Sequence, residues 1–220
     1  MSAVAGSDDV SIWKSGVILA VLAAICTALV SFTHKITTVR IAANEQAYLE
    51  QSLAPVLAGI PYTNNLSEST IIIELPHQLP GVAPVTVYRV YSDEVPVAAL
   101  FVVTARDGFT GPIKLLIGID NTGSITNVRI LEHRETPGLG DLIESSKSDW
   151  IQQFQKASLA TPSRNKWSIK RDGGVFDQLT GASVTPRAIV KAIKETLIYF
   201  ENNRNTVFPI EEAQPDGSPE

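Results

Sequence analysis

The segment Thr180–Pro186, with the sequence TGASVTP, places several hydroxyl groups directly before a run with helical periodicity that begins at Arg187. Proline suits the first position of a helix, so we predict that Thr185 caps this helix and, as the residue before a proline, has an extended backbone. At such a point the unpaired N–H groups and the positive end of the helix dipole converge. A phosphate attached to the Thr185 hydroxyl would therefore be stabilised electrostatically.

Other residues of this segment are suited to the same chemistry. Gly181 permits a close approach of the backbone, and the hydroxyl groups of Thr180 and Ser183 can donate hydrogen bonds to phosphate oxygens. The alternative is a plain helix cap and turn, which is the commonest role of these residue types. Spacing alone does not separate the two interpretations.

A second segment, His133–Gly140 with the sequence HRETPGLG, combines a proline and two glycines after a predicted strand. These residues predict a sharp turn with an exposed backbone, beside which Glu135 and Thr136 place polar groups. Such a loop can present N–H groups and a flat apolar patch to a ring. The alternative is an ordinary turn with a solvated histidine and glutamate.

The framework that must position these loops is predicted to be mainly a sheet. Four successive runs are rich in β-branched and aromatic residues, and tight polar links at Asp93-Glu94 and at Asp120–Gly123 join them in pairs. The second link has residue types that favour a reversal with positive φ. Four strands joined in this way indicate an antiparallel sheet, with strands at 85–92, 96–106, 112–119 and 124–131.

The remaining segments predict helices and short strands. Residues 35–58 have helical spacing, Thr70–Leu75 is a short apolar strand, and Asp141–Lys156 has the spacing of a helix. Trp167–Ile169 is a further candidate strand. The run Arg187–Phe200 is an amphipathic helix whose apolar stripe consists of Ile189, Ile193, Leu197 and Phe200.

The residues from Ser15 to Thr33 form an uncharged apolar run, with Lys14 before it and Lys35 shortly after it. As a helix this run would extend ~29 Å, close to the hydrocarbon thickness of a bilayer. A secretory signal peptide would have a shorter apolar core and a cleavage site, and a buried core helix would have a polar face. We therefore predict a retained transmembrane helix. The charges on its two sides do not decide its orientation.

Composition excludes several classes of site. The single cysteine, Cys26, lies in the apolar run, so the rest of the chain can form no disulfide and no cysteine-ligated metal or iron–sulfur centre. The formal net charge is −5 at pH 7 and there is no basic stripe, which argues against nucleic acid as a partner. We also find no dinucleotide-binding glycine fingerprint.

The predicted fold class is α+β, with one N-terminal transmembrane helix followed by a single domain that has an antiparallel sheet and flanking helices. We divide the chain into an N-terminal segment, a transmembrane helix, a stalk and lead-in, the main domain and a disordered acidic tail, at residues 1–14, 15–34, 35–84, 85–200 and 201–220.

Both loops carry a resemblance to a known family. TGASVT resembles the flavinylation motif [S/T]-G-A-[S/T]-x-T of the FMN-binding domain family, and HRETPGLGD resembles the second signature of that domain, in the same order along the chain. Both motifs occur together with a single N-terminal membrane helix, and this layout is similar to that of the FMN-binding subunit of the Rnf (Rsx) ion-translocating electron transport complexes. A related component of the sodium-translocating NADH:quinone reductase shares both signatures but is usually longer and carries SGAT. The resemblance covers most of residues 10–200.

The resemblance implies a covalent FMN, joined through its phosphate to the oxygen of Thr185 by a separate flavin transferase that uses FAD. It implies a bacterial inner-membrane subunit, with a cytoplasmic N-terminus and a periplasmic domain, that transfers electrons among the other membrane subunits of its complex and is not catalytic alone. It implies no metal ligand. The further cofactor-binding residues that it implies are Thr180, Gly181, Ala182, Ser183, Glu135, Thr136, Gly138 and Leu139.

Two other functions remain open at this stage. In the first, the chain is a membrane-tethered binding or assembly protein without redox chemistry, and both loops are structural. In the second, it is a hydrolase with Ser183 or Thr185 as nucleophile and His133 as base, for which the sequence identifies no acid that would orient the histidine.

Overall fold

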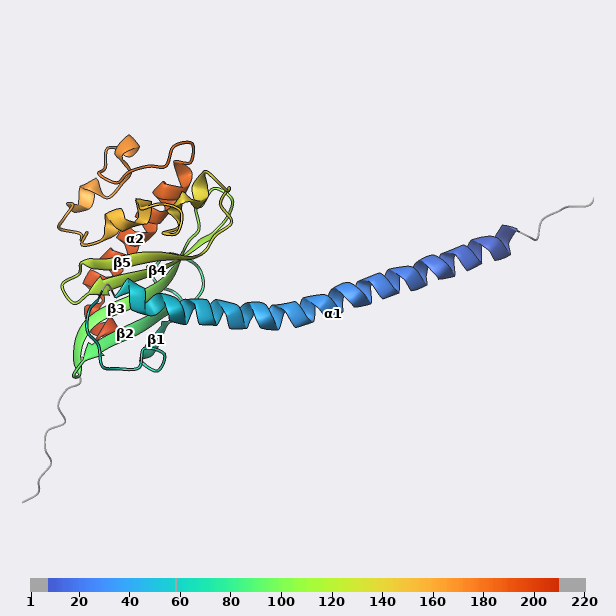
Figure 1. Ribbon diagram of the computed structural model, residues 1–220, viewed down its shortest axis with the longest axis horizontal. Helices are drawn as coiled ribbons and strands as arrows, with labels where there is room; N and C mark the ends of the chain where they lie inside the picture. The colour runs from blue at the N-terminus through green and yellow to red at the C-terminus, as the bar shows by residue number, and fades with distance from the viewer. Residues whose placement is uncertain (1–7, 58, 210–220) are drawn as a thin grey trace, which may run out of the picture. The chain divides into compact units, whose positions relative to one another are not determined.

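The computed structural model describes residues 8–57 and 59–209 (Figure 1). The chain divides into two units, residues 1–48 and residues 49–220. The first unit holds most of helix α1, Asp8–Val56, and the second holds the end of α1, a five-stranded sheet and the remaining helices. This arrangement confirms the predicted α+β class.

In the first unit, the segment Trp13–Thr38 of α1 is 26 residues long, has a mean hydropathy of 2.4 and contains no buried residue. Threonine hydroxyls in this segment are satisfied within the helix, since those of Thr27 and Thr33 donate to carbonyl oxygens four residues earlier. The segment would extend about 39 Å. By length and composition this helix can cross a membrane, and it contains the predicted span at residues 15–34.

The second unit is built on an antiparallel meander in which each strand pairs with the next along the chain. Asp93 and Glu94 both have positive φ, at 49° and 66°, and Gly123 has a φ of 87°. The two predicted reversals are therefore present. The strands are β1 Thr70–Ile73, β2 Val85–Ser92, β3 Val95–Ala105, β4 Ile113–Asp120 and β5 Ile125–Glu132.

The sheet begins before residue 85, because β1 pairs with β2 along its whole length, from Thr70 opposite Tyr88 to Ile73 opposite Val85. The short strand predicted at Thr70–Leu75, within the lead-in at residues 35–84, is thus present and forms the edge of the sheet.

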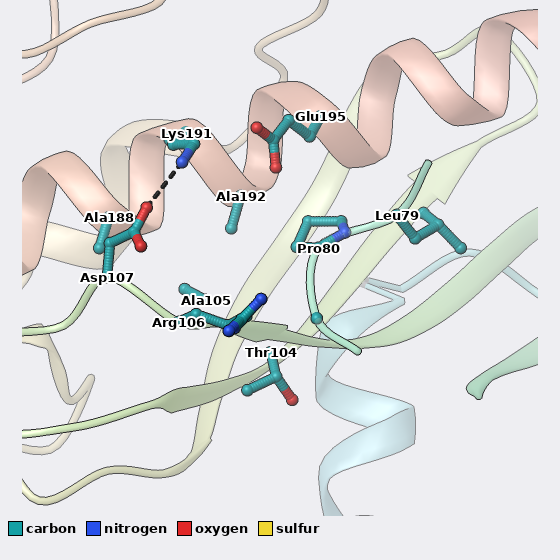
Figure 2. A pocket seen from close by; sticks show the side chains of 11 residues that line it. Leu79, Pro80, Thr104, Ala105, Arg106, Asp107, Ala188, Lys191, Ala192 and Glu195 are labelled. Carbon is teal, nitrogen blue, oxygen red and sulfur yellow. Dashed lines mark hydrogen bonds and ion pairs between the residues drawn. The ribbon is translucent and has the colours of Figure 1, made fainter. Parts of the chain in front are cut away.

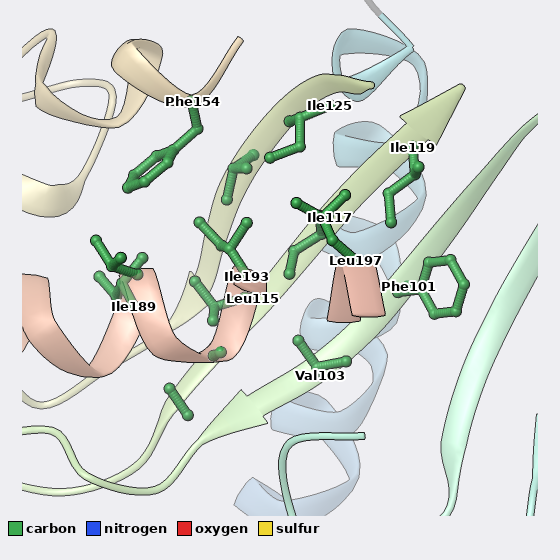
Figure 3. Packing of buried hydrophobic residues seen from close by; sticks show 14 of the residues in the cluster. Phe101, Val103, Leu115, Ile117, Ile119, Ile125, Phe154, Ile189, Ile193 and Leu197 are labelled. Atoms are coloured by element: carbon green, nitrogen blue, oxygen red, sulfur yellow. The ribbon is translucent and has the colours of Figure 1, made fainter. Parts of the chain in front are cut away.

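One face of the sheet packs against helix α2, Val184–Asn202, and against the 3-10 turns η1, Gly140–Ile143, and η2, Trp150–Phe154. Figure 3 shows this layer, in which the apolar stripe of α2 faces alternate residues of the central strands. Each fully buried aliphatic or aromatic side chain contributes about 1.5–3 kcal/mol relative to an exposed one. The layer includes Phe101, Val103, Leu115, Ile117, Ile189, Ile193 and Leu197.

The other face packs against the end of α1, where Leu53, Val56 and Leu57 contact the opposite side chains of β2, β3 and β4. The helix lies close to β4 at Gly118, where an added Cβ would be 2.7 Å from Val56 Cγ1. Thr126 Oγ1 also donates a hydrogen bond of 2.6 Å to the Val56 carbonyl oxygen. The central strands are therefore buried on both faces.

The segment predicted as a helix at Asp141–Lys156 is wrong in type, because it folds as the two short 3-10 turns η1 and η2. A polar side chain between the two turns bonds to backbone groups that a continuous helix would use. Ser148 Oγ donates to the Leu142 carbonyl oxygen and accepts the Trp150 N–H. The apolar residues that suggested a helix are nevertheless buried against the sheet.

The candidate strand Trp167–Ile169 is also absent from the described structure, where Ile169 forms only an isolated bridge with Phe176. It lies between the turns η3, Arg164–Lys166, and η4, Lys170–Asp172. At Gly174 an added Cβ would meet the Ser168 carbonyl oxygen at 1.9 Å, so the chain folds back tightly on itself directly after this segment.

The predicted tail also needs correction, because residues 201–209 are ordered. Helix α3, Arg204–Val207, follows α2, and Val207 and Phe208 are buried in the main core. Residues 210–220, the remainder of the predicted disordered tail, lie outside the described residues, as do residues 1–7.

Candidate functional site

Helix α2 begins two residues earlier than the sequence predicts. Ser183 is its N-cap, with φ −80° and ψ −17°, and Thr185 is already helical, so the predicted cap and extended backbone at Thr185 are wrong. Pro186 then occupies the third helical position, where its missing N–H costs nothing because the first four N–H groups of a helix have no partner within it. Its φ near −65° also fits the helix.

The hydroxyl of Thr185 is the point at which the two predicted loops meet. Thr185 Oγ1 donates a hydrogen bond of 2.6 Å to Oε2 of Glu135, across 50 residues of sequence. Thr185 is 0% exposed and Glu135 is 4% exposed. A hydrogen bond between a hydroxyl and a buried carboxylate is stronger than one between neutral groups, and leaving either partner unpaired would be costly.

The carboxylate of Glu135 is held from a second direction by the loop between β3 and β4. Its Oε1 accepts the backbone N–H of Thr110 at 3.2 Å, and the Thr110 hydroxyl donates to the carbonyl oxygen of Arg134. The backbone N–H of Glu135 donates to Nδ1 of His133 at 3.0 Å. Glu135 is thus fixed at its backbone and at both carboxylate oxygens.

His133 is part of this support and not a base for Thr185. Because Nδ1 accepts the Glu135 N–H, the neutral ring carries its proton on Nε2, which lies 2.9 Å from Oε1 of Glu144. The structure thus supplies the orienting acid that the sequence did not reveal. Both ring nitrogens are occupied in these contacts, however, so the arrangement does not resemble a nucleophile–histidine–acid triad.

A small ionic cluster continues from His133 along η1. Lys147 Nζ lies 2.7 Å from Oε1 of Glu144 and 2.9 Å from Oδ2 of Asp141. The hydrogen bond from Lys147 lowers the pKa of both carboxyl groups, and those bonds raise the pKa of Lys147. This cluster ties the end of the HRETPGLGD segment to the turn that follows it.

Two glycines, Gly108 and Gly140, allow the backbone to approach the Glu135–Thr185 pair, and a third, Gly181, allows a close approach to Leu139. An added Cβ at Gly140 would lie 2.8 Å from Glu135 Oε2 and 3.3 Å from Thr185 Oγ1, and one at Gly108 would lie 2.9 Å from Glu135 Oε1. Gly181, with a φ of 81°, is bordered by Leu139, whose Cδ2 would be 3.2 Å from an added Cβ. Sequence reasoning did not select Gly108, Thr110 or Gly140 as site residues, although Gly140 lies within the recognised loop.

Within the HRETPGLG loop, the carbonyl oxygen of Thr136 accepts the N–H groups of Leu139 and Gly140 at 3.2 and 3.0 Å. Gly138 has a φ of 76°, as the predicted sharp turn requires. The loop thereby presents the side chain of Leu139, which is 44% exposed, on the surface beside Gly181.

In the TGASVT segment, Ala182 donates its N–H to the Leu179 carbonyl oxygen at 3.2 Å. Among the described residues, the hydroxyl groups of Thr180 and Ser183 make no hydrogen bond, and Ser183 leaves the start of α2 without a side-chain cap. Val184, which follows, is 39% exposed. Thr180 and Ser183 are thus near Thr185 in sequence, but among the described residues neither side chain is hydrogen-bonded to the Glu135 loop.

A separate pocket of about 220 Å³ lies farther along α2, between that helix and the end of β3 (Figure 2). Lys191 Nζ and Asp107 Oδ2 form an ion pair of 2.6 Å at its wall, and burial raises the pKa of Glu195, which also lines it. Ala188, one turn after Thr185, is part of this wall. Thr185 does not line this pocket, so the pocket is distinct from the Glu135–Thr185 pair.

Comparison with known proteins assigns these features to a family. The FMN-binding domain family matches residues 108–198, and the family described as the RnfG N-terminal region matches residues 1–56. A protein of Shewanella baltica (strain OS223), named as a component of the ion-translocating oxidoreductase complex, is 39% identical over 197 residues, which are 90% of this chain and 93% of the relative. The chain belongs to the RnfG family. The Salmonella typhi relative of the same name is 41% identical and covers 87% of this chain and 92% of its own.

The limits of the two matches agree with the structure of this RnfG-family chain. The RnfG N-terminal region ends at residue 56, where α1 ends, and the FMN-binding domain begins at Gly108, beside the Glu135 carboxylate, and continues into α2. The second match thus contains Thr110, Glu135, Gly140 and Thr185. The chain therefore has the FMN-binding domain of its family.

Proposed function

We propose that this chain is the electron-transferring subunit of a membrane-bound ion-translocating oxidoreductase complex, and that it carries FMN joined by a phosphoester bond to Oγ1 of Thr185. The observation that supports this most strongly is the convergence of both signature loops on one hydroxyl, through the contact of 2.6 Å between Thr185 and Glu135. The match to the FMN-binding domain family spans both loops.

The residues around Thr185 fit a phosphate group. The 19-residue helix α2 begins without a side-chain cap. Its first N–H groups and the positive end of its dipole are therefore available to bind an anion at this end. The hydroxyl groups of Thr180 and Ser183 lie in the same segment and can donate to phosphate oxygens. The absence of a side chain at Gly140 and Gly181 keeps the surrounding backbone close.

The surface beside the hydroxyl suits the apolar part of a flavin. Leu139, beside Gly181, and Val184, directly before Thr185, are large apolar residues that are exposed on the two loops. Bound FMN would supply the redox chemistry, while the protein supplies position and local charge. Leu139 and Val184 would lie against the ring or its ribityl chain, and Ala182, Thr136 and Gly138 would shape the loops that hold it.

We further propose that α1 is a retained span of the bacterial inner membrane, with residues 1–14 in the cytoplasm and residues 85–200 as a periplasmic FMN-binding domain. The partners would be the other membrane subunits of an Rnf (Rsx) type complex, as the names of the relatives suggest, and a flavin transferase that attaches the cofactor. The alternative is a membrane-tethered assembly protein without redox chemistry.

The proposal is tested by measuring the intact mass of the full-length chain after co-expression with a flavin transferase. We expect the mass of one added FMN and flavin fluorescence that persists after denaturation. Thr185→Ala should abolish both signals, whereas Thr206→Ala, at an exposed threonine in α3, should retain them. A wild-type mass equal to that of the bare polypeptide would favour the assembly protein, and covalent flavin on Thr185→Ala would refute the assignment of the site.

A further inference from the structure

We propose that Glu135 is the catalytic base for the attachment of the flavin, so that the acceptor chain itself removes the proton from Thr185. This inference rests on the proposed function. Its basis is the position of Glu135 Oε2, which already accepts the proton of the hydroxyl that must become the nucleophile, at 2.6 Å. A general base must lie within hydrogen-bond reach of the proton that it takes, and this pair meets that requirement before any transferase binds.

The carboxylate of Glu135 is held in place by contacts that do not depend on Thr185. The Thr110 N–H donates to its other oxygen, and the backbone N–H of Glu135 donates to His133. His133 is in turn held by Glu144 at 2.9 Å. A base fixed in this way needs no rearrangement when the hydroxyl reacts, which is the condition under which proton transfer is most effective.

The hydroxyl is buried, so a flavin donor reaches it only after part of its cover moves aside. Gly140 lies next to the hydroxyl, and the preceding residues Gly138 and Leu139 are exposed. This short segment is held by backbone bonds to the Thr136 carbonyl oxygen. Its displacement would open the site and leave the bonds of Glu135 to Thr110 and His133 unchanged.

Other titratable groups near the site are less suited to this role. Both ring nitrogens of His133 are engaged, by Glu135 and by Glu144. Asp141 and Glu144 are paired with Lys147, and in the described part of the chain neither is hydrogen-bonded to Thr185. Glu135 is therefore the titratable group that touches the reacting oxygen.

The reaction balances with a flavin dinucleotide as donor, bound by the transferase. Thr185 Oγ1 forms a bond to the phosphorus that carries the flavin, and the bond from that phosphorus to the bridging oxygen of the pyrophosphate breaks. Adenosine monophosphate leaves with the electron pair, and the hydroxyl proton passes to Glu135 Oε2. No oxidation or reduction takes place in this step.

The variant Glu135→Gln distinguishes a role of Glu135 as a base from a role in holding the structure. The amide has almost the same shape, and its oxygen can still accept the Thr110 N–H, but it cannot take the hydroxyl proton. With purified full-length chain as acceptor, flavin adenine dinucleotide as donor and a flavin transferase, we expect kcat for modification to fall by at least ~100-fold with an unchanged KM for the acceptor chain. Formation of the covalent product is followed by intact mass.

Glu132→Gln, at an exposed glutamate three residues earlier, is the matched control and should be modified at the wild-type rate. Equal kcat for Glu135→Gln and wild type would overturn the proposal and place the base on the transferase. A rise in KM with unchanged kcat would also overturn it, because it would show that Glu135 only shapes the docking surface.

Glu135→Asp covers the case in which the amide variant does not fold. It keeps a carboxylate but withdraws it by one methylene from Thr185, so kcat should fall at least ~10-fold, and a wild-type rate would contradict the proposal. Failure of the wild-type chain to accept flavin at all would instead refute the proposed function, so the two failures are distinguishable.

Discussion

At the scale of single residues, the hydrogen bond between Thr185 and Glu135 satisfies two buried polar groups at once. A buried acceptor left without its donor costs about 1–3 kcal/mol, so the pair stabilises the loop arrangement and also orients the Thr185 hydroxyl towards Glu135. Esterification of Thr185 would remove the donor. Attachment of a cofactor here would therefore change the surroundings of Glu135 directly.

The ionic cluster at Lys147 leads to a prediction about pH. Lys147 lowers the pKa of Asp141 and Glu144, so this contribution to stability is present above the pKa values of the unfolded chain and is lost as the pH falls through the folded values. The pKa of Lys147 is raised, so its own contribution is lost only as the pH rises through that folded value. The cluster therefore stabilises the domain throughout the neutral range.

We expect Lys147→Met to lower the urea midpoint of the full-length chain modestly near pH 7, since Lys147 is partly exposed and solvent screens its ion pairs. The difference from wild type should shrink on acidification through the carboxyl range. Lys156→Met, at an exposed lysine that forms no salt bridge within the described residues, should show no such pH dependence. A difference that stays constant down to low pH would contradict this account.

At the scale of elements, the end of α1 is fixed to the sheet by groups that replace an ordinary helix cap. The last carbonyl oxygens of a helix have no partner within it. Here Thr126 Oγ1 donates to the carbonyl oxygen of Val56, and Asn127 Nδ2 donates to that of Pro55. Because β5 supplies both donors, hydrogen bonds as well as apolar contacts hold the helix end on this face of the sheet within the second unit.

Gly118 on β4 is the residue that permits this packing. An added Cβ would lie 2.2 Å from Thr126 Oγ1 and 2.7 Å from Val56 Cγ1, and neither neighbour can withdraw without breaking the layer. We expect Gly118→Ala to lower the free energy of unfolding by about 1–3 kcal/mol, measured with urea on the full chain in detergent. Gly16→Ala, where an added Cβ meets nothing within 4 Å, should not be destabilising. Equal stability of both variants would contradict this packing.

At the scale of the whole molecule, the sequence places a helix able to span a membrane in the same chain as the FMN-binding domain. The proposed topology predicts that the domain lies on the periplasmic side. In a Cys26→Ser background, Ser67→Cys introduces a single thiol at an exposed position before β1. A membrane-impermeant maleimide should label this chain in intact spheroplasts. Labelling only after lysis would show that the domain has the opposite orientation.

Local patterns in the sequence were sufficient for most of the framework. The apolar span, the strand alternation of β2 to β5, the polar reversals at Asp93-Glu94 and Asp120–Gly123, and the stripe on α2 each depend on residues close together in the chain. Periodicity reports such local preferences directly, because side chains alternate on a strand and repeat every 3.6 residues on a helix. The two loop motifs were recognisable for the same reason.

The tertiary structure decided what periodicity could not. The burial of Phe208 depends on core contacts with distant parts of the chain, and the 3-10 turns at residues 141–156 depend on hydrogen bonds of Ser148 that apolar periodicity does not report. The meeting of Thr185 with Glu135 is the clearest case, since 50 residues separate them and only the packing of α2 against the sheet brings the hydroxyl to the carboxylate. The sequence thus determined which groups are available for chemistry, and packing determined which of them touch.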